Sequence, residues 1–108
     1  MGSYVKIDAA AAYTLIKTPP SPIVLDVRTG EEYKARHIEG AINLPWIKVN
    51  SEVEQLLPDK KALILVYCST GLRSAMVARK LIAKGYYDVR DFGAINEWPY
   101  PTVRTKRS

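Results

Sequence analysis

Two short, almost continuous apolar runs constrain the fold of this chain most strongly. They are Ile23-Val24-Leu25-Asp26-Val27 and Ala62-Leu63-Ile64-Leu65-Val66-Tyr67. Each run is short for a helix and rich in β-branched or aromatic residues, which is typical of a strand buried on both faces of a parallel sheet. Each run is also followed by a segment with the features of a helix. The pattern therefore predicts an α/β fold in which helices cover the sheet.

The rest of the chain continues this alternation. Further strands are predicted at residues 4–7, 41–44 and 88–92, and helices at 9–17, 31–36, after Pro45 and at 74–84, with a helical turn at 94–98. Asp8 is placed to cap the first helix, and Thr29 with Glu32 fits a capping box. We expect a single domain over residues 1–108, with a roughly five-stranded, mostly parallel sheet and helices on both faces. Its core covers about residues 4–103, and residues 104–108 form a mobile basic tail.

Composition excludes several classes of protein. The 108 residues include one cysteine and one histidine, so we expect no internal disulfide, no metal site and no cofactor. No apolar run is long enough to span a membrane, and the first residues lack the apolar core of a signal peptide, so a cytoplasmic protein is expected. The 16 Lys and Arg residues exceed the 11 Asp and Glu residues but are dispersed. This favours small anionic ligands rather than nucleic acid and leaves the oligomeric state open.

The single cysteine stands where a predicted strand gives way to a predicted helix. It opens the run Cys68-Ser69-Thr70-Gly71-Leu72-Arg73-Ser74. Backbone N–H groups from 69 to 74 can form an anion nest there, and the positive end of the helix adds to it. Gly71 permits a left-handed backbone, Arg73 offers a fixed charge, and three hydroxyl groups lie among them. Such surroundings favour a reactive thiolate, although a free cysteine can also be an inert packing residue.

These residues resemble a known family. The 68–74 loop is similar to the active-site loop of single-domain rhodaneses, which are sulfurtransferases. Two more segments match: Leu25-Asp26-Val27-Arg28-Thr29-Gly30-Glu31-Glu32-Tyr33 with His37-Ile38-Glu39-Gly40-Ala41-Ile42-Asn43-Leu44-Pro45, and, more weakly, Gly85-Tyr86-Tyr87-Asp88-Val89 with Phe92-Gly93-Ala94-Ile95 and Trp98. The resemblance covers about residues 4–103. It departs from the family pattern at Arg36 and Ala94, where glycine is usual, which questions the local turns there.

The resemblance implies a thiosulfate sulfurtransferase with a rhodanese-like fold. Cys68 is then the catalytic residue that carries a persulfide, and Ser69, Thr70, Gly71, Leu72, Arg73 and Ser74 bind the substrate. The donor is a small anion such as thiosulfate, and the acceptor is cyanide, a thiol or a protein. Because the chain has no second cysteine, no internal disulfide can resolve the persulfide, and the acceptor must come from outside.

Two other functions stay open. The first is a module that relays sulfur or docks a partner without free turnover. The second is a cysteine-dependent phosphatase or arsenate reductase, since related phosphatases use the motif Cys-x-x-x-x-x-Arg. The present loop is one residue shorter between Cys68 and Arg73, which the resemblance links to sulfur substrates. Tyr67 also stands where tyrosine phosphatases tend to have histidine.

Four residue types near the loop are interpreted as structural. Asp26 and Arg28 are expected to pair locally or to satisfy buried backbone groups. His37 is interpreted as structural rather than as a general base, because a thiolate needs none. The two tryptophans, Trp46 and Trp98, are expected to pack in the core.

Overall fold

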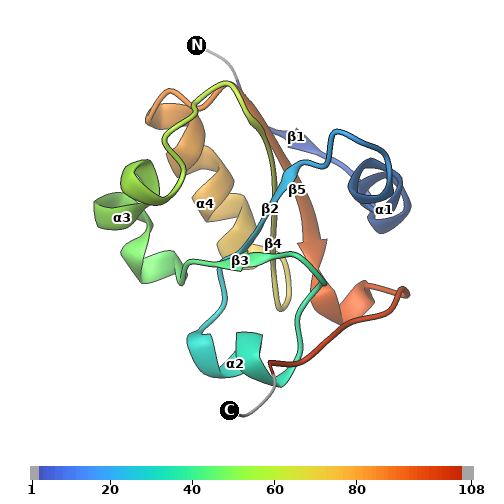
Figure 1. Cartoon of the computed structure of the whole chain (residues 1–108). Helices are drawn as coiled ribbons and strands as arrows, with labels where there is room; N and C mark the ends of the chain where they lie inside the picture. Colours follow the sequence, from blue (N-terminus) through green and yellow to red (C-terminus); the bar gives the residue numbers. More distant parts are fainter. Residues whose placement is uncertain (1–2, 106–108) are drawn as a thin grey trace.

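The computed structural model describes residues 3–105, and within them strands and helices alternate as the sequence predicts (Figure 1). The strands are β1 (Val5–Lys6), β2 (Ile23–Asp26), β3 (Ile42–Asn43), β4 (Leu63–Cys68) and β5 (Asp88–Ala94). They form one sheet in the order β1-β5-β4-β2-β3, and every neighbouring pair is parallel. The predicted α/β fold with a five-stranded sheet is confirmed, and the sheet is wholly rather than mostly parallel.

Helices cover both faces of this sheet, as predicted. Helix α1 (Ala9–Lys17) lies on one face, while α3 (Val49–Leu56) and α4 (Leu72–Ala83) lie on the other (Figure 1). The short helix α2 (Gly30–Ala35) follows β2 at the carboxyl edge of the sheet, and single 3-10 turns occupy Trp46–Lys48 and Ile95–Glu97. None of the helices within residues 3–105 has the length and apolarity needed to cross a membrane.

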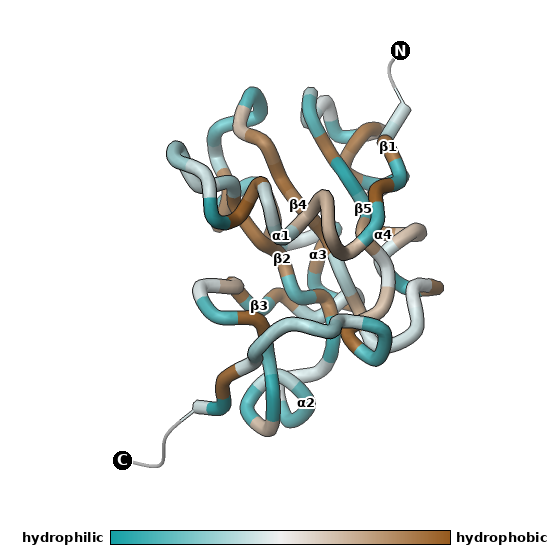
Figure 2. Tube along the Cα trace, turned by 90° about the vertical axis from the view of Figure 1, so that its right-hand side faces the viewer, coloured by the Kyte–Doolittle hydropathy of each residue, from teal (hydrophilic) through white to brown (hydrophobic). Residues whose placement is uncertain are grey.

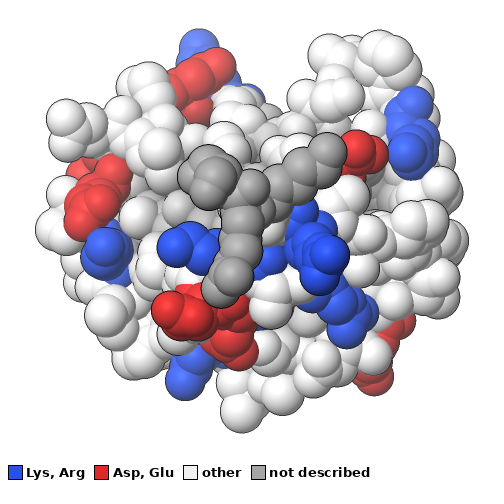
Figure 3. Space-filling model, turned by 60° about the horizontal axis from the view of Figure 1, so that its bottom comes forward, with Lys and Arg blue, Asp and Glu red and all other residues white. Residues whose placement is uncertain are grey.

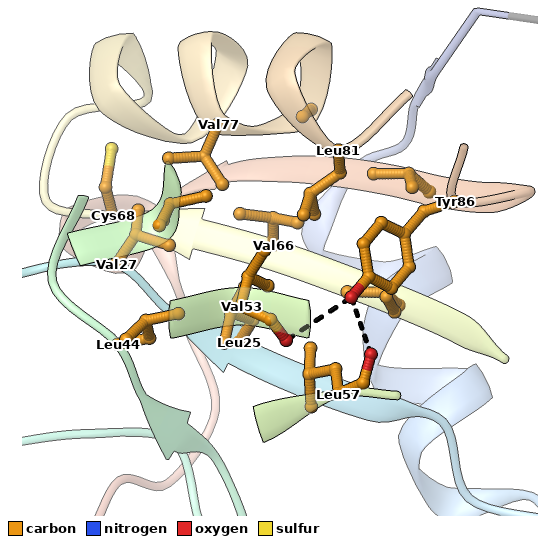
Figure 4. Close-up of a cluster of buried hydrophobic side chains, with 14 residues drawn as sticks. Leu25, Val27, Leu44, Val53, Leu57, Val66, Cys68, Val77, Leu81 and Tyr86 are labelled. Atoms are coloured by element: carbon orange, nitrogen blue, oxygen red, sulfur yellow. Dashed lines mark hydrogen bonds between the residues drawn. The ribbon is translucent and has the colours of Figure 1, made fainter. Parts of the chain in front are cut away.

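The core is divided by the sheet into two layers. Because successive side chains of a strand point to opposite faces, Ile64, Val66 and Cys68 of β4 join the cluster under α3 and α4, whereas Leu65 and Tyr67 join the cluster under α1. Figure 2 shows the hydrophobic colour following β4 and β2 through the interior. Cys68 is thus the last residue in a row of packed apolar side chains on β4, and this packing fixes where its side chain lies (Figure 4).

Local features of the chain explain where α1, α2 and α4 begin. The Asp8 carboxylate accepts from the Ala11 N–H at 2.8 Å and starts α1. Thr29 and Glu32 form the predicted reciprocal capping box at the start of α2. Helix α4 begins at Leu72, two residues earlier than predicted, because Gly71 acts as its N-cap with a φ of +99°. Leu72, Arg73 and Ser74 therefore belong to the first turn of a helix rather than to a loop.

The structure also shows how the chain ends, and what backbone it has at Arg36 and Ala94, where the rhodanese pattern usually has glycine. Met1 and Gly2, and the last three residues of the predicted basic tail, lie outside the described residues. Just before them, the Thr105 N–H donates to the Lys34 carbonyl oxygen at 2.9 Å. Arg36 and Ala94 both have extended backbone, with φ of −168° and −111°. Neither position therefore requires glycine, and the local turns questioned from the sequence form without it.

Candidate active site

Cys68 is the last residue of β4, the middle strand of the sheet. The residue is only 1% exposed, so a reagent has very little access to it. Its neighbours below are the aliphatic side chains of the α3–α4 layer, and its sulfur points toward the N-terminal end of α4 (Figure 4). In open α/β sheets this carboxyl edge is where ligands bind.

Two backbone groups donate hydrogen bonds to the sulfur. The Gly71 N–H lies 2.9 Å from Sγ, and the Ser74 N–H lies 3.3 Å from it. The Ser74 hydroxyl oxygen is a further neighbour at 3.5 Å. Of the backbone N–H groups predicted to converge between 69 and 74, these two reach the sulfur itself. Two N–H donors at the positive end of a helix stabilise a thiolate more than a neutral thiol.

Gly71 makes this geometry possible. Its φ of +99° is in the left-handed region, which residues with a Cβ adopt only at a cost. In that conformation the Gly71 N–H is directed toward Sγ. The Gly71 carbonyl oxygen is directed into α4, where it accepts from the Ala75 N–H at 3.3 Å and from the Ser74 hydroxyl at 3.1 Å. One residue therefore ends the loop, caps α4 and donates to the sulfur.

The remaining loop residues point in different directions. The Ser69 hydroxyl donates to the Glu32 carboxylate at 3.0 Å, which joins the loop to α2. Thr70 is exposed, and Leu72 is 80% exposed. Of the three hydroxyls grouped in the sequence, only that of Ser74 therefore lies beside Sγ.

Arg73 stands in the first turn of α4 with its side chain exposed. Its guanidinium carbon lies 5.1 Å from the centre of the Trp46 ring, which is a cation–π distance. Trp46 packs against the core but is only partly buried, so it supports Arg73 as well as filling the interior. Trp98, by contrast, is buried under α1 as expected. Figure 3 looks onto the edge of the molecule where α2 lies and shows Lys and Arg side chains near its centre.

Glu32 is a neighbour of the loop that the sequence identified only as a capping residue. Its carboxylate accepts from the Thr29 N–H at 3.0 Å and from the Ser69 hydroxyl. The hydrogen bond from Thr29 is the main cause that lowers the pKa of Glu32, and the bond from Ser69 lowers it further. The residue is therefore an ionised link between α2 and the loop at neutral pH.

The residues interpreted as structural have structural partners. Arg28 and Asp26 form a buried ion pair at 2.6 Å, and Arg28 also donates to the Arg36 carbonyl oxygen. The His37 Nδ1 lies 2.7 Å from the Tyr33 carbonyl oxygen, and its ring stacks on that of Tyr33. These contacts satisfy the polar groups within the fold.

Tyr67 is directed away from the sulfur. As the neighbour of Cys68 on the strand it belongs to the opposite face, where its hydroxyl accepts from the Ile38 N–H at 3.1 Å. Burial is the main cause that raises the pKa of Tyr67, so the phenol stays neutral at ordinary pH. Within residues 3–105 no group of three metal-ligating side chains is placed to hold a metal ion.

The fold and the site together define a class: a parallel α/β domain with a cysteine at the end of its middle strand, facing the N-terminus of the next helix. The profile of the rhodanese-like domain matches residues 8–99. This protein therefore belongs to the rhodanese family.

Relatives and solved structures agree with this assignment. The thiosulfate sulfurtransferase PspE of Escherichia coli is 34% identical over 80 residues, which cover 74% of this chain and 77% of PspE. The thiosulfate sulfurtransferase GlpE of Coxiella burnetii is 31% identical over 96 residues, covering 88% and 87%. A rhodanese-related protein from Thermoplasma volcanium superposes with a TM-score of 0.81 at 32% identity, covering 93% of this chain and 98% of that one.

Some relatives are much longer proteins. The adenylyltransferase and sulfurtransferase UBA4 of Candida albicans is 35% identical over 92 residues, which cover 79% of this chain but 21% of UBA4. The chain therefore spans about a fifth of that protein, and the similarity concerns one domain of it.

Proposed function

We propose that this protein is a sulfurtransferase that moves a sulfane sulfur from thiosulfate, through a persulfide on Cys68, to an external acceptor. The observation that carries the proposal is the pair of backbone N–H donors on Sγ at the N-terminus of α4. The names of the relatives PspE and GlpE support the choice of thiosulfate as donor.

The first half of the reaction is a displacement at sulfur. The Cys68 thiolate attacks the outer sulfur of thiosulfate, a new S–S bond forms, and the S–S bond of thiosulfate breaks. Sulfite leaves with the electron pair of that bond. The first N–H groups of a helix have no acceptor inside it, so those of Leu72 and Arg73 are available to the departing anion. The exposed guanidinium of Arg73 adds a fixed positive charge.

The second half returns the sulfur to another molecule. A nucleophile attacks the outer sulfur of the persulfide, and the electron pair of the S–S bond returns to Sγ. With cyanide as acceptor the product is thiocyanate. Because Cys68 is buried and the outer sulfur lies only about 2 Å further out, the acceptor must be narrow: cyanide, or a thiolate at the end of a flexible chain. The cycle starts from a reduced thiol, which fits the cytoplasmic location expected from the sequence.

A second candidate is a sulfur carrier that hands its persulfide to a protein and does not turn over freely with cyanide. The similarity to one domain of UBA4, whose name joins an adenylyltransferase to a sulfurtransferase, supports it. Repeated turnover with thiosulfate and cyanide supports the enzyme, whereas release of at most one thiocyanate per protein, from sulfur loaded before the assay and with no reloading by thiosulfate, supports the carrier.

The test compares wild type with Cys68→Ser in a thiocyanate assay. Wild type is expected to form thiocyanate from thiosulfate and cyanide, and Cys68→Ser is expected to form none while unfolding at a similar urea concentration. Thiocyanate formation by folded Cys68→Ser would refute the mechanism. Hydrolysis of a small aryl phosphate by wild type, in the absence of sulfur transfer, would favour a phosphatase instead.

A further inference from the structure

Asp91 is a buried carboxylate that the proposed reaction does not use. It lies in β5 beside Val66 of β4 and is 0% exposed. Its Oδ1 accepts from the Gly93 N–H at 2.8 Å, while within the described residues its Oδ2 has no hydrogen-bond partner. Burying a carboxylate with one unpaired oxygen is costly, so the one hydrogen bond that Asp91 accepts, from Gly93, is the contact that can give it a role.

Gly93 forms the irregular step between β4 and β5. The register changes there: Val66 pairs with Asp91 but Tyr67 pairs with Gly93, so Phe92 is an extra residue. Gly93 has a φ of +85°, and the Asp91 carboxylate bridges across Phe92 to its N–H. The side chain of Asp91 therefore closes this bulge and fixes its shape.

The bulge lies directly under the loop that holds the sulfur. A Cβ added to Gly71 would lie 3.6 Å from the Cα of Gly93, so the two glycines are near neighbours separated by about the space of a methyl group, and Cys68 itself pairs with Ala94, the residue after Gly93. Gly71 provides the shorter of the two N–H bonds to Sγ. Two hydrogen bonds, from Gly93 to Asp91 and from Gly71 to Cys68, thus lie next to each other, with the two glycines as neighbours between them.

We propose that Asp91 is a positioning residue. By closing the bulge at Gly93, it fixes the position of the Gly71 N–H relative to the sulfur of Cys68. The inference rests on Cys68 as the nucleophile of the proposed sulfur transfer. It assigns Asp91 no contact with the donor or the acceptor. Loss of the carboxylate should therefore lower the reactivity of the thiol toward any electrophile, charged or neutral.

The test measures alkylation of Cys68 by iodoacetamide at pH 7, because this uncharged reagent does not depend on anion binding. Asp91→Leu keeps the number of side-chain heavy atoms but removes the acceptor, and should slow alkylation about tenfold, the effect of one hydrogen bond to a charged atom. Asp91→Asn keeps an acceptor oxygen and should stay within twofold of wild type. Tyr86→Phe is the matched control, since it removes a buried hydroxyl bonded to Leu57, far from the loop, and should leave alkylation unchanged.

Amide hydrogen exchange supplies a second readout. The Gly93 N–H should be protected in wild type and in Asp91→Asn, and unprotected in Asp91→Leu. An alkylation rate of Asp91→Leu equal to that of wild type, or equal slowing in Asp91→Asn and Asp91→Leu, would overturn the proposal. If Asp91→Leu does not fold, an unprotected Gly93 amide in wild type would still overturn it. Fast alkylation without any sulfur transfer would instead count against the proposed function alone.

Discussion

Gly71→Ala separates the conformational role of this residue from its role at the sulfur. With a φ of +99°, alanine at position 71 must adopt the left-handed region, at a cost of about 1–2 kcal/mol. The added Cβ meets Gly93 at an ordinary contact distance of 3.6 Å, so steric overlap adds little. The expected loss of stability is therefore about 1–2 kcal/mol, or a fall in Tm of roughly 4–16 °C for a domain of this size.

The same substitution should also reduce the reactivity of Cys68. If the backbone relaxes toward negative φ, the 2.9 Å bond from the Gly71 N–H to Sγ is lost. A hydrogen bond to a charged group contributes about 1.5–3 kcal/mol, so alkylation and persulfide formation should slow at least about tenfold. Gly40→Ala is the control, because Gly40 also has a positive φ, of +85°, and an added Cβ there would meet no atom within 4 Å. Equal slowing in both variants, or no slowing in Gly71→Ala, would refute this reasoning.

Three further predictions follow from charged groups around the site. Arg73→Ala should raise the KM for thiosulfate about tenfold in steady-state kinetics. Arg79→Ala, on the same helix, should leave this KM unchanged. An unchanged KM in Arg73→Ala would exclude Arg73 as a ligand of the donor. Because the pKa of Glu32 is lowered from 4.5 in the folded state, its ionised form stabilises the fold above that pH. Urea unfolding should thus show Glu32→Gln to be less stable than wild type at neutral pH, with the difference vanishing as the pH falls below the lowered pKa; a constant difference would contradict this. Arg28→Met should cost about 3–5 kcal/mol by denaturant unfolding, because it leaves the buried Asp26 carboxylate unpaired, and a loss below 1 kcal/mol would contradict it.

The sequence predicted the architecture well because short-range patterns determine it. The apolar runs that became β2 and β4, the cap at Asp8 and the box of Thr29 with Glu32 are all read from neighbouring residues. Helix α4 was misplaced by two residues because its start depends on the left-handed Gly71. Gly71 lies beside Gly93, a neighbour 22 positions away in the chain that a local sequence pattern does not show.

The site was predictable in its composition but not in its geometry. Cys68 and its run of small and polar residues identify the strand end and the helix start. Which N–H groups reach Sγ, and that Ser69 turns to Glu32 rather than to the sulfur, depend on the packing of α2 and β5 against the loop. The support of Arg73 by Trp46 likewise joins segments that are distant in sequence.

The central claim is that Cys68 carries a sulfane sulfur, and intact mass spectrometry tests it most directly. After incubation with thiosulfate and removal of excess reagent, the protein should gain about 32 Da, the mass of one sulfur atom. Cyanide should remove this mass, and Cys68→Ser should never acquire it. A wild-type protein whose mass stays unchanged after thiosulfate, or a gain that persists after cyanide, would contradict the account.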